Sequence, residues 1–485
     1  MTAKCVMVLG TTSGAGKSWL ATALCRWYAR RGLRVVPFKA QNMSNNARVV
    51  PGPGGCLGEI GSAQYFQALA ARALPEVRMN PVLLKPEGDT ASQVVVWGEV
   101  RDDLTRMPWR ERSELLWPHA RTALHALMAE NDVVVIEGAG SPAEINLHAS
   151  DYVNMRTALA AEAACLLVTD IDRGGAFAHL FGTHQLLPAN ERALLRGFVL
   201  NRFRGDAALL VPGPAQLQGL TGVPTLAVLP MWRGHGLPEE DGVFDDAPSG
   251  PTQGLRIAII AYPRISNLDE FQPLCQVDGV RLVWVRDPRE LEGTDWIILP
   301  GSKHTSSDLA WLRERRLDTI ITRHAGQGRP VLGICGGLQM LGDALVDPHG
   351  VDGAATGLGL LPLSTQFDQR KSLRRGAMRF TTTAGCWSAL AGVAWQGYEI
   401  HHGRSLPVST PALPGPVLSN DAGEPIGWQR ASVLGLYAHG LFESPAALQA
   451  LFGATTPTLD SVFDGLADFV ERHFEPGSLA QLIGG

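Results

Sequence analysis

The chain has 485 residues, of which 45% are hydrophobic and 18% charged, as in a globular protein of two or three domains. Its formal net charge of −5 excludes a general attraction to nucleic acid, and no apolar run reaches the roughly 18 residues of a membrane span. Seven widely spaced cysteines without a Cys-x-x-Cys pair argue against a zinc site or a disulfide framework and predict a cytoplasmic protein.

A phosphate-binding loop is predicted at the N-terminus. A strand at 5–9 leads into a glycine-rich turn that ends in Lys17 and Ser18, and a helix follows at 19–31. Backbone N–H groups in such a turn cradle phosphate, Lys17 neutralises charge, and Ser18 can hold Mg²⁺. Five residues separate the outer glycines, as in the dethiobiotin-synthetase-like branch of P-loop proteins, which the turn resembles. The predicted ATP-binding residues are Gly10, Thr11, Thr12, Ser13, Gly14, Ala15, Gly16, Lys17 and Ser18.

Polar residues follow the second predicted strand. This strand, 34–38, ends in the polar stretch 39–46, and open α/β sheets bind ligands at the carboxyl ends of their strands. Beyond it we expect a helix that begins at 58 and runs to about 73, and then a strand at 93–96.

Acidic residues end two further apolar strands. The strand at 133–136 closes on Glu137, a usual place for an acid that organises Mg²⁺, although a solvated loop acid is the alternative. The strand at 163–168 leads to Asp170 and Arg173, which suggest metal and phosphate handling or, alternatively, a structural salt bridge. The predicted Mg²⁺ ligands are Ser18, Glu137 and Asp170.

Strands at 197–200 and 224–229 complete the N-terminal half, and Asn201 at the end of the first is expected to contact the adenine. At least six apolar strands thus alternate with helices, which predicts a parallel sheet with right-handed crossovers. The region that follows is rich in turn residues and acids. We therefore predict an α/β protein with an N-terminal P-loop domain at 1–231, a linker at 232–253, a second α/β domain at 254–450 and a helical tail at 451–485.

The second half begins with three predicted strands and a turn that can bind an oxyanion. The strands are expected at 255–260, 280–285 and 296–299. The last one runs into Gly301 and Ser302, whose backbone N–H groups could stabilise an oxyanion together with that of Gly336.

Cys335 lies on a predicted nucleophile elbow. An apolar strand at 331–334 runs straight into it, Gly336 and the next glycine let the backbone reverse, and a helix pattern follows. The helix dipole favours the thiolate. A buried core cysteine at a tight turn is the alternative. Gln339, one helical turn beyond, could face a bound substrate.

His439 is the predicted catalytic base among thirteen histidines. A strand at 433–437 delivers it, and it follows the nucleophile by roughly 100 residues, as in known triads. His401 and His402 are the next candidates. A final amphipathic helix at 459–474 is expected to pack rather than to catalyse.

The elbow at 333–339, the turn at 300–302 and His439 together resemble the class I, triad-type glutamine amidotransferases. Over almost its full length the chain resembles the cobyric acid synthase family. The stretches that carry this resemblance, in the same order, are 38–44, 79–86, 137–147, 170–177 and 437–443.

This resemblance implies an ATP- and glutamine-dependent ligase of cobalamin biosynthesis. Such enzymes convert the b, d, e and g carboxylates of adenosylcobyrinic acid a,c-diamide to amides, with L-glutamine as the nitrogen source and Mg²⁺ beside ATP. The corrinoid or phosphate contacts expected on this basis are Lys39, Gln41, Asn42, Ser44 and Arg173.

One position departs from the amidotransferase pattern. The usual acid two residues after the histidine is replaced here by Leu441. The family is known to lack this acid, so we expect Cys335 and His439 to act as a dyad and leave Glu443 unassigned.

Two other functions share parts of this pattern. Cobyrinic acid a,c-diamide synthase shares the two-domain plan, but the stretch 39–44 favours the later pathway step. A partition-type P-loop ATPase with an inactive elbow domain would usually show a second lysine near the start of its P-loop. It would also leave Cys335 and His439 unexplained.

Overall fold

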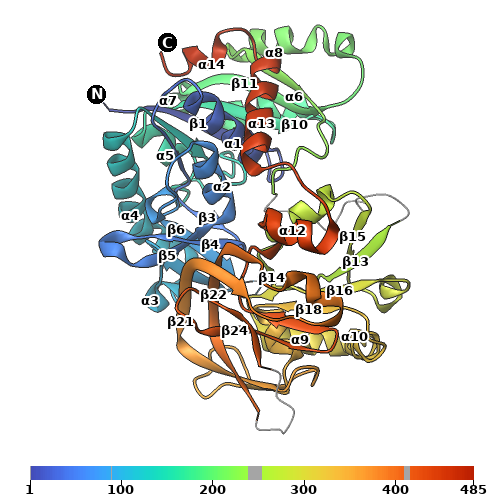
Figure 1. The fold of residues 1–485 in the computed structure, drawn as a ribbon. Helices are drawn as coiled ribbons and strands as arrows, with labels where there is room; N and C mark the ends of the chain where they lie inside the picture. Colours follow the sequence, from blue (N-terminus) through green and yellow to red (C-terminus); the bar gives the residue numbers. More distant parts are fainter. Residues whose placement is uncertain (1, 89, 239–253, 409–414, 485) are drawn as a thin grey trace.

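The computed structural model describes residues 2–88, 90–238, 254–408 and 415–484, so most of the predicted linker lies outside the described residues. Two α/β parts stack on each other (Figure 1). We call residues 2–238 the N-terminal part and residues 254–452 the C-terminal part. No helix within these ranges is both long and apolar enough to cross a membrane.

A six-stranded parallel sheet forms the centre of the N-terminal part, in the order β12-β11-β10-β1-β9-β2. Its strands are β1 (Lys4–Gly10), β2 (Val35–Phe38), β9 (Val133–Glu137), β10 (Ala164–Asp170), β11 (Leu195–Phe203) and β12 (Thr225–Pro230). Their central residues are apolar and buried because helices cover both faces. These helices are α1 (Lys17–Ala29), α2 (Ser62–Ala70), α4 (Trp109–Glu130), α5 (Met155–Ala160), α6 (Ala176–Leu186), α7 (Ala189–Arg192) and α8 (Gly213–Thr221).

Small strands and one short helix extend this part toward the C-terminal part and correct two predictions. They are β3 (Asn42–Met43), β4 (Ala47–Pro51), β5 (Leu57–Gly61), β6 (Val82–Pro86), β7 (Ser92–Val96), β8 (Glu99–Val100) and the short helix α3 (Asp102–Thr105). The strand expected at 93–96 exists as β7, but it pairs antiparallel with β6 outside the parallel sheet. The expected helix start at 58 is wrong. Residues 57–61 form β5, because Gly58 lies so close to Gly98 that a Cβ would stand 2.8 Å from its Cα.

The C-terminal part is built on one large mixed sheet. Its parallel centre has the order β15-β13-β16-β18-β25. The parallel strands are β13 (Leu255–Ile260), β15 (Val280–Val285), β16 (Trp296–Leu299), β18 (Val331–Ile334) and β25 (Val433–Leu436). The remaining strands are β19 (Ala344–Val346), β20 (Ala355–Thr356), β21 (Leu363–Phe380), β22 (Ala394–Pro407), β23 (Pro416–Ser419) and β24 (Pro425–Arg430), with β14 (Ile265–Ser266) and β17 (Gly301–Ser302) as a separate pair. The helices are α9 (Thr305–Glu314), α10 (Leu317–Gly326), α11 (Gly336–Leu341) and α12 (Pro445–Phe452).

Apolar packing joins the two parts. The long antiparallel hairpin of β21 and β22 reaches the N-terminal part (Figure 1). Tyr398 and Ile400 on β22 share one buried cluster with Ala47, Val49 and Leu83. This buried apolar contact packs the hairpin against the N-terminal part.

The end of the chain returns to the N-terminal part. The helix α13 (Leu459–His473) lies beside α1, and α14 (Ser478–Gln481) follows it (Figure 1). Phe463 and Leu466 pack into the core on that face, and Asp460 forms an ion pair with buried Arg26. The expected terminal helix is therefore present in a packing role. The division of the chain into domains stays a prediction.

Candidate active sites

Cys335 lies on a strained turn between β18 and α11. Its φ of 52° and ψ of −107° are rarely adopted by a residue with a side chain. The neighbouring glycines allow the turn, because a Cβ on Gly337 would stand 1.9 Å from the carbonyl oxygen of Leu299. The sulfur is buried and lies 3.7 Å from the carbonyl oxygen of Ile400. This geometry is that of a nucleophile elbow rather than of a relaxed core cysteine.

His439 follows β25 and is fully buried. Its ring stacks on Tyr398 with centroids 5.0 Å apart, and its Nδ1 lies 2.9 Å from Oε1 of Glu270. Its Nε2 has no hydrogen-bond partner within the described ranges, which leaves this nitrogen for the sulfur of Cys335. Burial lowers the pKa of His439, but Glu270 and Cys335 outweigh burial and raise it to about 10. The imidazole is therefore held protonated, which is the state that pairs with a thiolate.

Glu270 corrects the expectation of a dyad. It lies in the 3₁₀ segment η4 (Leu268–Gln276), and its second oxygen accepts a hydrogen bond of 3.0 Å from the amide of Gly440. Two bonds therefore hold the carboxylate against His439, as a third acid would be held in a triad. The sequence reasoning missed it. The available signal was a pair of adjacent acids, Asp269 and Glu270, between Leu268 and Phe271.

The predicted oxyanion turn meets the elbow. A Cβ on Gly336 would stand 2.8 Å from the amide nitrogen of Ser302, and one on Gly301 would stand 3.3 Å from Cε1 of His439. The Ser302 hydroxyl donates to Asp308 at 2.6 Å, and burial raises the pKa of Asp308 to about 7. Backbone amides of the turn and of α11 therefore lie close to the sulfur, as an oxyanion site requires.

Gln339, His401 and His402 do not join this catalytic group directly. The Gln339 amide is buried, accepting from Thr305 at 3.0 Å and donating to Tyr437 at 3.4 Å. His401 lies 3.3 Å from Glu399, and burial lowers the pKa of His402 to about 4. These contacts favour His439 over both alternatives as the base.

Replacing Glu270 by glutamine is expected to lower kcat/KM for glutamine hydrolysis by between about 10² and 10⁴-fold. Loss of the carboxylate removes one of the two groups that raise the pKa of His439, so the imidazole loses its proton at a lower pH. The alkaline limb of the pH–rate profile should then move to lower pH. The exposed Glu292→Gln is the matched control. A slower variant with an unshifted alkaline limb would contradict the assigned role.

The P-loop lies at the N-terminus of α1. Lys17 donates to the carbonyl oxygens of Thr12 and Gly140 at 3.0 and 3.1 Å. Asn201 does not point outward toward a base: its Nδ2 donates to the carbonyl oxygen of Ala15 at 2.9 Å, so it holds the loop itself. Only a glycine fits at position 16, where φ is 96° and a Cβ would stand 2.1 Å from Asn201.

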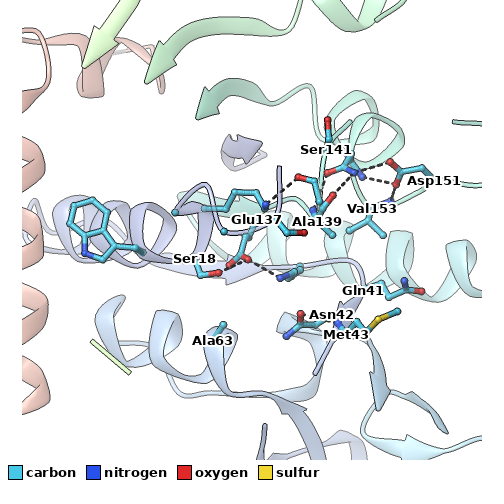
Figure 2. Close-up of a pocket in the computed structure, with 18 of the residues that line it drawn as sticks. Ser18, Gln41, Asn42, Met43, Ala63, Glu137, Ala139, Ser141, Asp151 and Val153 are labelled. Carbon is cyan, nitrogen blue, oxygen red and sulfur yellow. Dashed lines mark hydrogen bonds and ion pairs between the residues drawn. The ribbon is translucent and has the colours of Figure 1, made fainter. Parts of the chain in front are cut away.

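Glu137 is the centre of a buried polar group beside this loop. It accepts hydrogen bonds from Ser18 at 2.8 Å, Lys39 at 2.7 Å and Gln67 at 2.5 Å. Burial raises the pKa of Glu137, but Lys39 opposes this effect and keeps the pKa below its usual value. Figure 2 shows Ser18 and Glu137 pointing toward one another at the wall of a cavity of about 460 Å³. The solvated loop acid is thereby excluded.

The cavity brings together only some of the predicted ligand contacts. Lys39, Gln41 and Asn42 line it, and the last two are labelled in Figure 2. Gln41 accepts a hydrogen bond of 2.7 Å from Tyr152. Ser44 and Arg173 lie outside the lining; Ser44 instead accepts from the amide of Asn46. The sequence reasoning missed Tyr152 and the buried glutamines of α2, whose i, i+3 spacing within an apolar helix was the available signal.

Oxygen donors suited to Mg²⁺ are present at Ser18 and Glu137. Asp170 instead forms salt bridges, with a carboxylate oxygen 3.1 Å from Arg202 and 3.4 Å from Arg173. These contacts agree with the alternative prediction of a structural salt bridge. No group of three His, Cys, Asp or Glu side chains in the described ranges could hold a metal ion. Mg²⁺ normally keeps several waters and binds one or two protein ligands beside a phosphate, so the pair at the P-loop fits it.

The fold and these two sites define a glutamine amidotransferase joined to a P-loop nucleotide-binding domain. Residues 256–447 match the family of the CobB/CobQ-like glutamine amidotransferase domain, and residues 6–233 match the CobQ/CobB/MinD/ParA nucleotide binding domain. Cobyric acid synthase of Methylibium petroleiphilum is 73% identical over 99% of this chain and 97% of that protein. The cobyric acid synthase of Leptothrix cholodnii is 71% identical over 99% of this chain and 97% of that protein. The one of Variovorax paradoxus is 66% identical over 100% of both chains. The chain belongs to the cobyric acid synthase family.

Proposed function

We propose that this chain catalyses the reaction of cobyric acid synthase. It converts the b, d, e and g carboxylates of adenosylcobyrinic acid a,c-diamide to amides, using ATP and L-glutamine. The observation that carries the proposal is the presence, in one chain, of a buried Cys–His–Glu group and a P-loop cavity with a buried Lys39–Glu137 pair. The family membership supplies the corrinoid. Seven free cysteines fit the cytoplasmic location included in the proposal.

Ammonia is released in the C-terminal part. His439 holds the proton of Cys335, whose sulfur attacks the side-chain carbonyl carbon of glutamine. The amides at Ser302 and Gly336 stabilise the oxyanion of the tetrahedral intermediate. His439 then protonates the departing nitrogen, ammonia leaves, and a thioester of glutamate remains. Water, deprotonated by His439, attacks the thioester and releases glutamate.

The carboxylate is activated in the N-terminal part. A corrinoid carboxylate oxygen attacks the γ-phosphorus of the substrate ATP, giving an acyl phosphate and ADP. Lys17 and the P-loop amides neutralise and orient the phosphates, and Lys39 adds positive charge at the cavity wall. Mg²⁺ held near Ser18 and Glu137 would neutralise phosphate oxygens when bound. Ammonia then attacks the acyl carbon and phosphate leaves, which makes the amide.

Ammonia must pass between the two sites without becoming ammonium. Free ammonia is mostly protonated near neutral pH and then lacks a nucleophilic lone pair, so a route sheltered from water is required. The buried apolar cluster of β4, β6 and β22 lies at the contact between the two parts and could shelter part of such a route.

The proposal is tested by mass spectrometry of the corrinoid after incubation with purified protein, Mg·ATP and glutamine. The a,c-diamide should gain four amides. Amidation of the unamidated corrinoid alone would instead indicate cobyrinic acid a,c-diamide synthase. ATP hydrolysis with neither corrinoid modified would reject the corrinoid assignment and favour the switch-type ATPase.

A further inference from the structure

A buried arginine joins the two parts next to the glutaminase group. Arg48 lies on β4 of the N-terminal part with 2% of its side chain exposed. Its guanidinium pairs with Asp269 and, at 2.6 and 3.0 Å, with both oxygens of Glu443, and these two acids belong to the C-terminal part. Glu443, which the sequence analysis left unassigned, thus forms an ion pair with Arg48 that links the two parts.

These contacts lead directly to His439. Asp269 immediately precedes Glu270, whose carboxylate holds the Nδ1 of that histidine. The arginine carbon Cζ also lies 5.0 Å from the ring centroid of Tyr398, the ring that stacks on His439. A shift of Arg48 would therefore disturb both the partner and the packing surface of the catalytic base.

Hydrogen bonds between side chains and backbone groups join the same two segments. Asn267 donates from Nδ2 to the carbonyl oxygen of Ala47 at 2.7 Å, and the amide of Leu268 donates to Oδ1 of Asn46 at 3.0 Å. Residues 46–48 of the N-terminal part therefore hold residues 267–270 of the C-terminal part from several directions.

Arg48 also contacts a residue that lines the P-loop cavity. Its Cζ lies 5.0 Å from the ring of Phe66, and Phe66 is part of the cavity lining together with Ala63 and Asn42. The amide of Ser62, at the start of α2, donates to the carbonyl oxygen of Asn46 at 3.1 Å. A ligand that moves α2 or the 39–46 stretch would therefore move the anchor of the 267–270 segment.

Charge makes Arg48 difficult to replace. Burial raises the pKa of Glu443, whereas Arg48 lowers it. Two buried acids, Asp269 and Glu270, and the partly exposed Glu443 lie close together, and a buried acid left without a cationic or hydrogen-bonding partner is costly. A planar guanidinium can bind two carboxylates at once, which an ammonium group does less well.

We infer that Arg48 is a positioning residue that couples the two sites. By holding Asp269 and Glu443, it sets Glu270 against His439, so that glutamine hydrolysis depends on the state of the P-loop cavity. This inference rests on the proposed function and names the side chain that connects its two sites.

The test compares Arg48→Met and Arg48→Lys with wild type in three assays: glutamine hydrolysis alone, hydrolysis with corrinoid a,c-diamide and ATP, and amidation from ammonium salt. In both variants kcat for glutamine should fall at least about tenfold, with a small change in KM. Hydrolysis should no longer respond to corrinoid and ATP, more glutamine should be consumed per amide formed, and amidation from ammonia should persist. The lysine variant should be the less affected.

Lys371→Met is the matched control. Lys371 also forms an interdomain ion pair, at 2.6 Å to Glu59, but Glu59 keeps Lys85 as a partner at 2.8 Å. This variant should retain the response to corrinoid and ATP. Arg48 variants that keep the wild-type response would overturn the inference, as would equal losses with glutamine and with ammonia, which indicate general destabilisation. A wild type that hydrolyses glutamine but leaves the corrinoid unchanged would reject the proposed function instead, and basal kcat would still test the placement of Glu270.

Discussion

Cys335→Ala is expected to lower glutamine-dependent amidation at least about 10³-fold, while amidation from ammonium salt continues at a rate close to wild type. The thioester can form only on the sulfur of Cys335, and a factor of 10³ corresponds to about 4 kcal/mol of activation free energy. The P-loop cavity belongs to the other part of the chain and is left intact. Mass spectrometry of the corrinoid, with each nitrogen source supplied separately, measures both rates.

Cys386→Ala is the control for this experiment, because Cys386 is a free and exposed cysteine of the same part. It should leave both nitrogen sources usable. Equal loss of the two activities in Cys335→Ala would mean that the elbow supports the fold rather than the release of ammonia. Continued use of glutamine would mean that another group is the nucleophile.

The sequence predicted the features of the glutaminase group that are local. A strand, a cysteine and two glycines are contiguous, so Cys335 could be recognised as an elbow, and the strand before His439 marked that residue among thirteen histidines. Glu270 stands 169 positions before His439 and has no motif of its own. Only the folding of η4 onto the turn after β25 brings the two together, and no local pattern records such a contact.

The same distinction holds for the fold. The central strands of the parallel sheets contain runs of apolar residues, because both faces of these sheets are covered. Such runs can be recognised in a sequence. The hairpin of β21 and β22 is half-exposed and rich in charged residues, so its long strands give no clear signal. The sequence pattern places Gly58 in a helix, because the constraint that puts it in a strand is the backbone of Gly98, 40 positions away in the chain. Arg48 likewise shows its role only once both parts are in place.

Replacing Lys17 by methionine is expected to abolish amidation from both nitrogen sources, with a loss of at least about 10³-fold, while glutamine hydrolysis continues. The methionine keeps most of the length of the side chain but removes the positive charge that we propose neutralises the phosphates of ATP. Lys17 donates to the carbonyl oxygens of Thr12 and Gly140, so its ammonium group is already held at the mouth of the loop. Corrinoid amidation and glutamate release, measured in the same reaction, separate the two activities.

Lys4→Met provides the matched control, because Lys4 is exposed at the start of the same strand that leads into the loop. It should leave amidation unchanged, since its charge lies at the opposite end of β1. Amidation by Lys17→Met from ammonia alone would show that the loop serves glutaminase coupling and not carboxylate activation.

Because Cys335→Ala and Lys17→Met are expected to fail in complementary ways, mixing the two variants should not restore glutamine-dependent amidation to the wild-type rate if ammonia travels within one chain. Full restoration on mixing would instead show that ammonia crosses through solvent, where most of it is protonated.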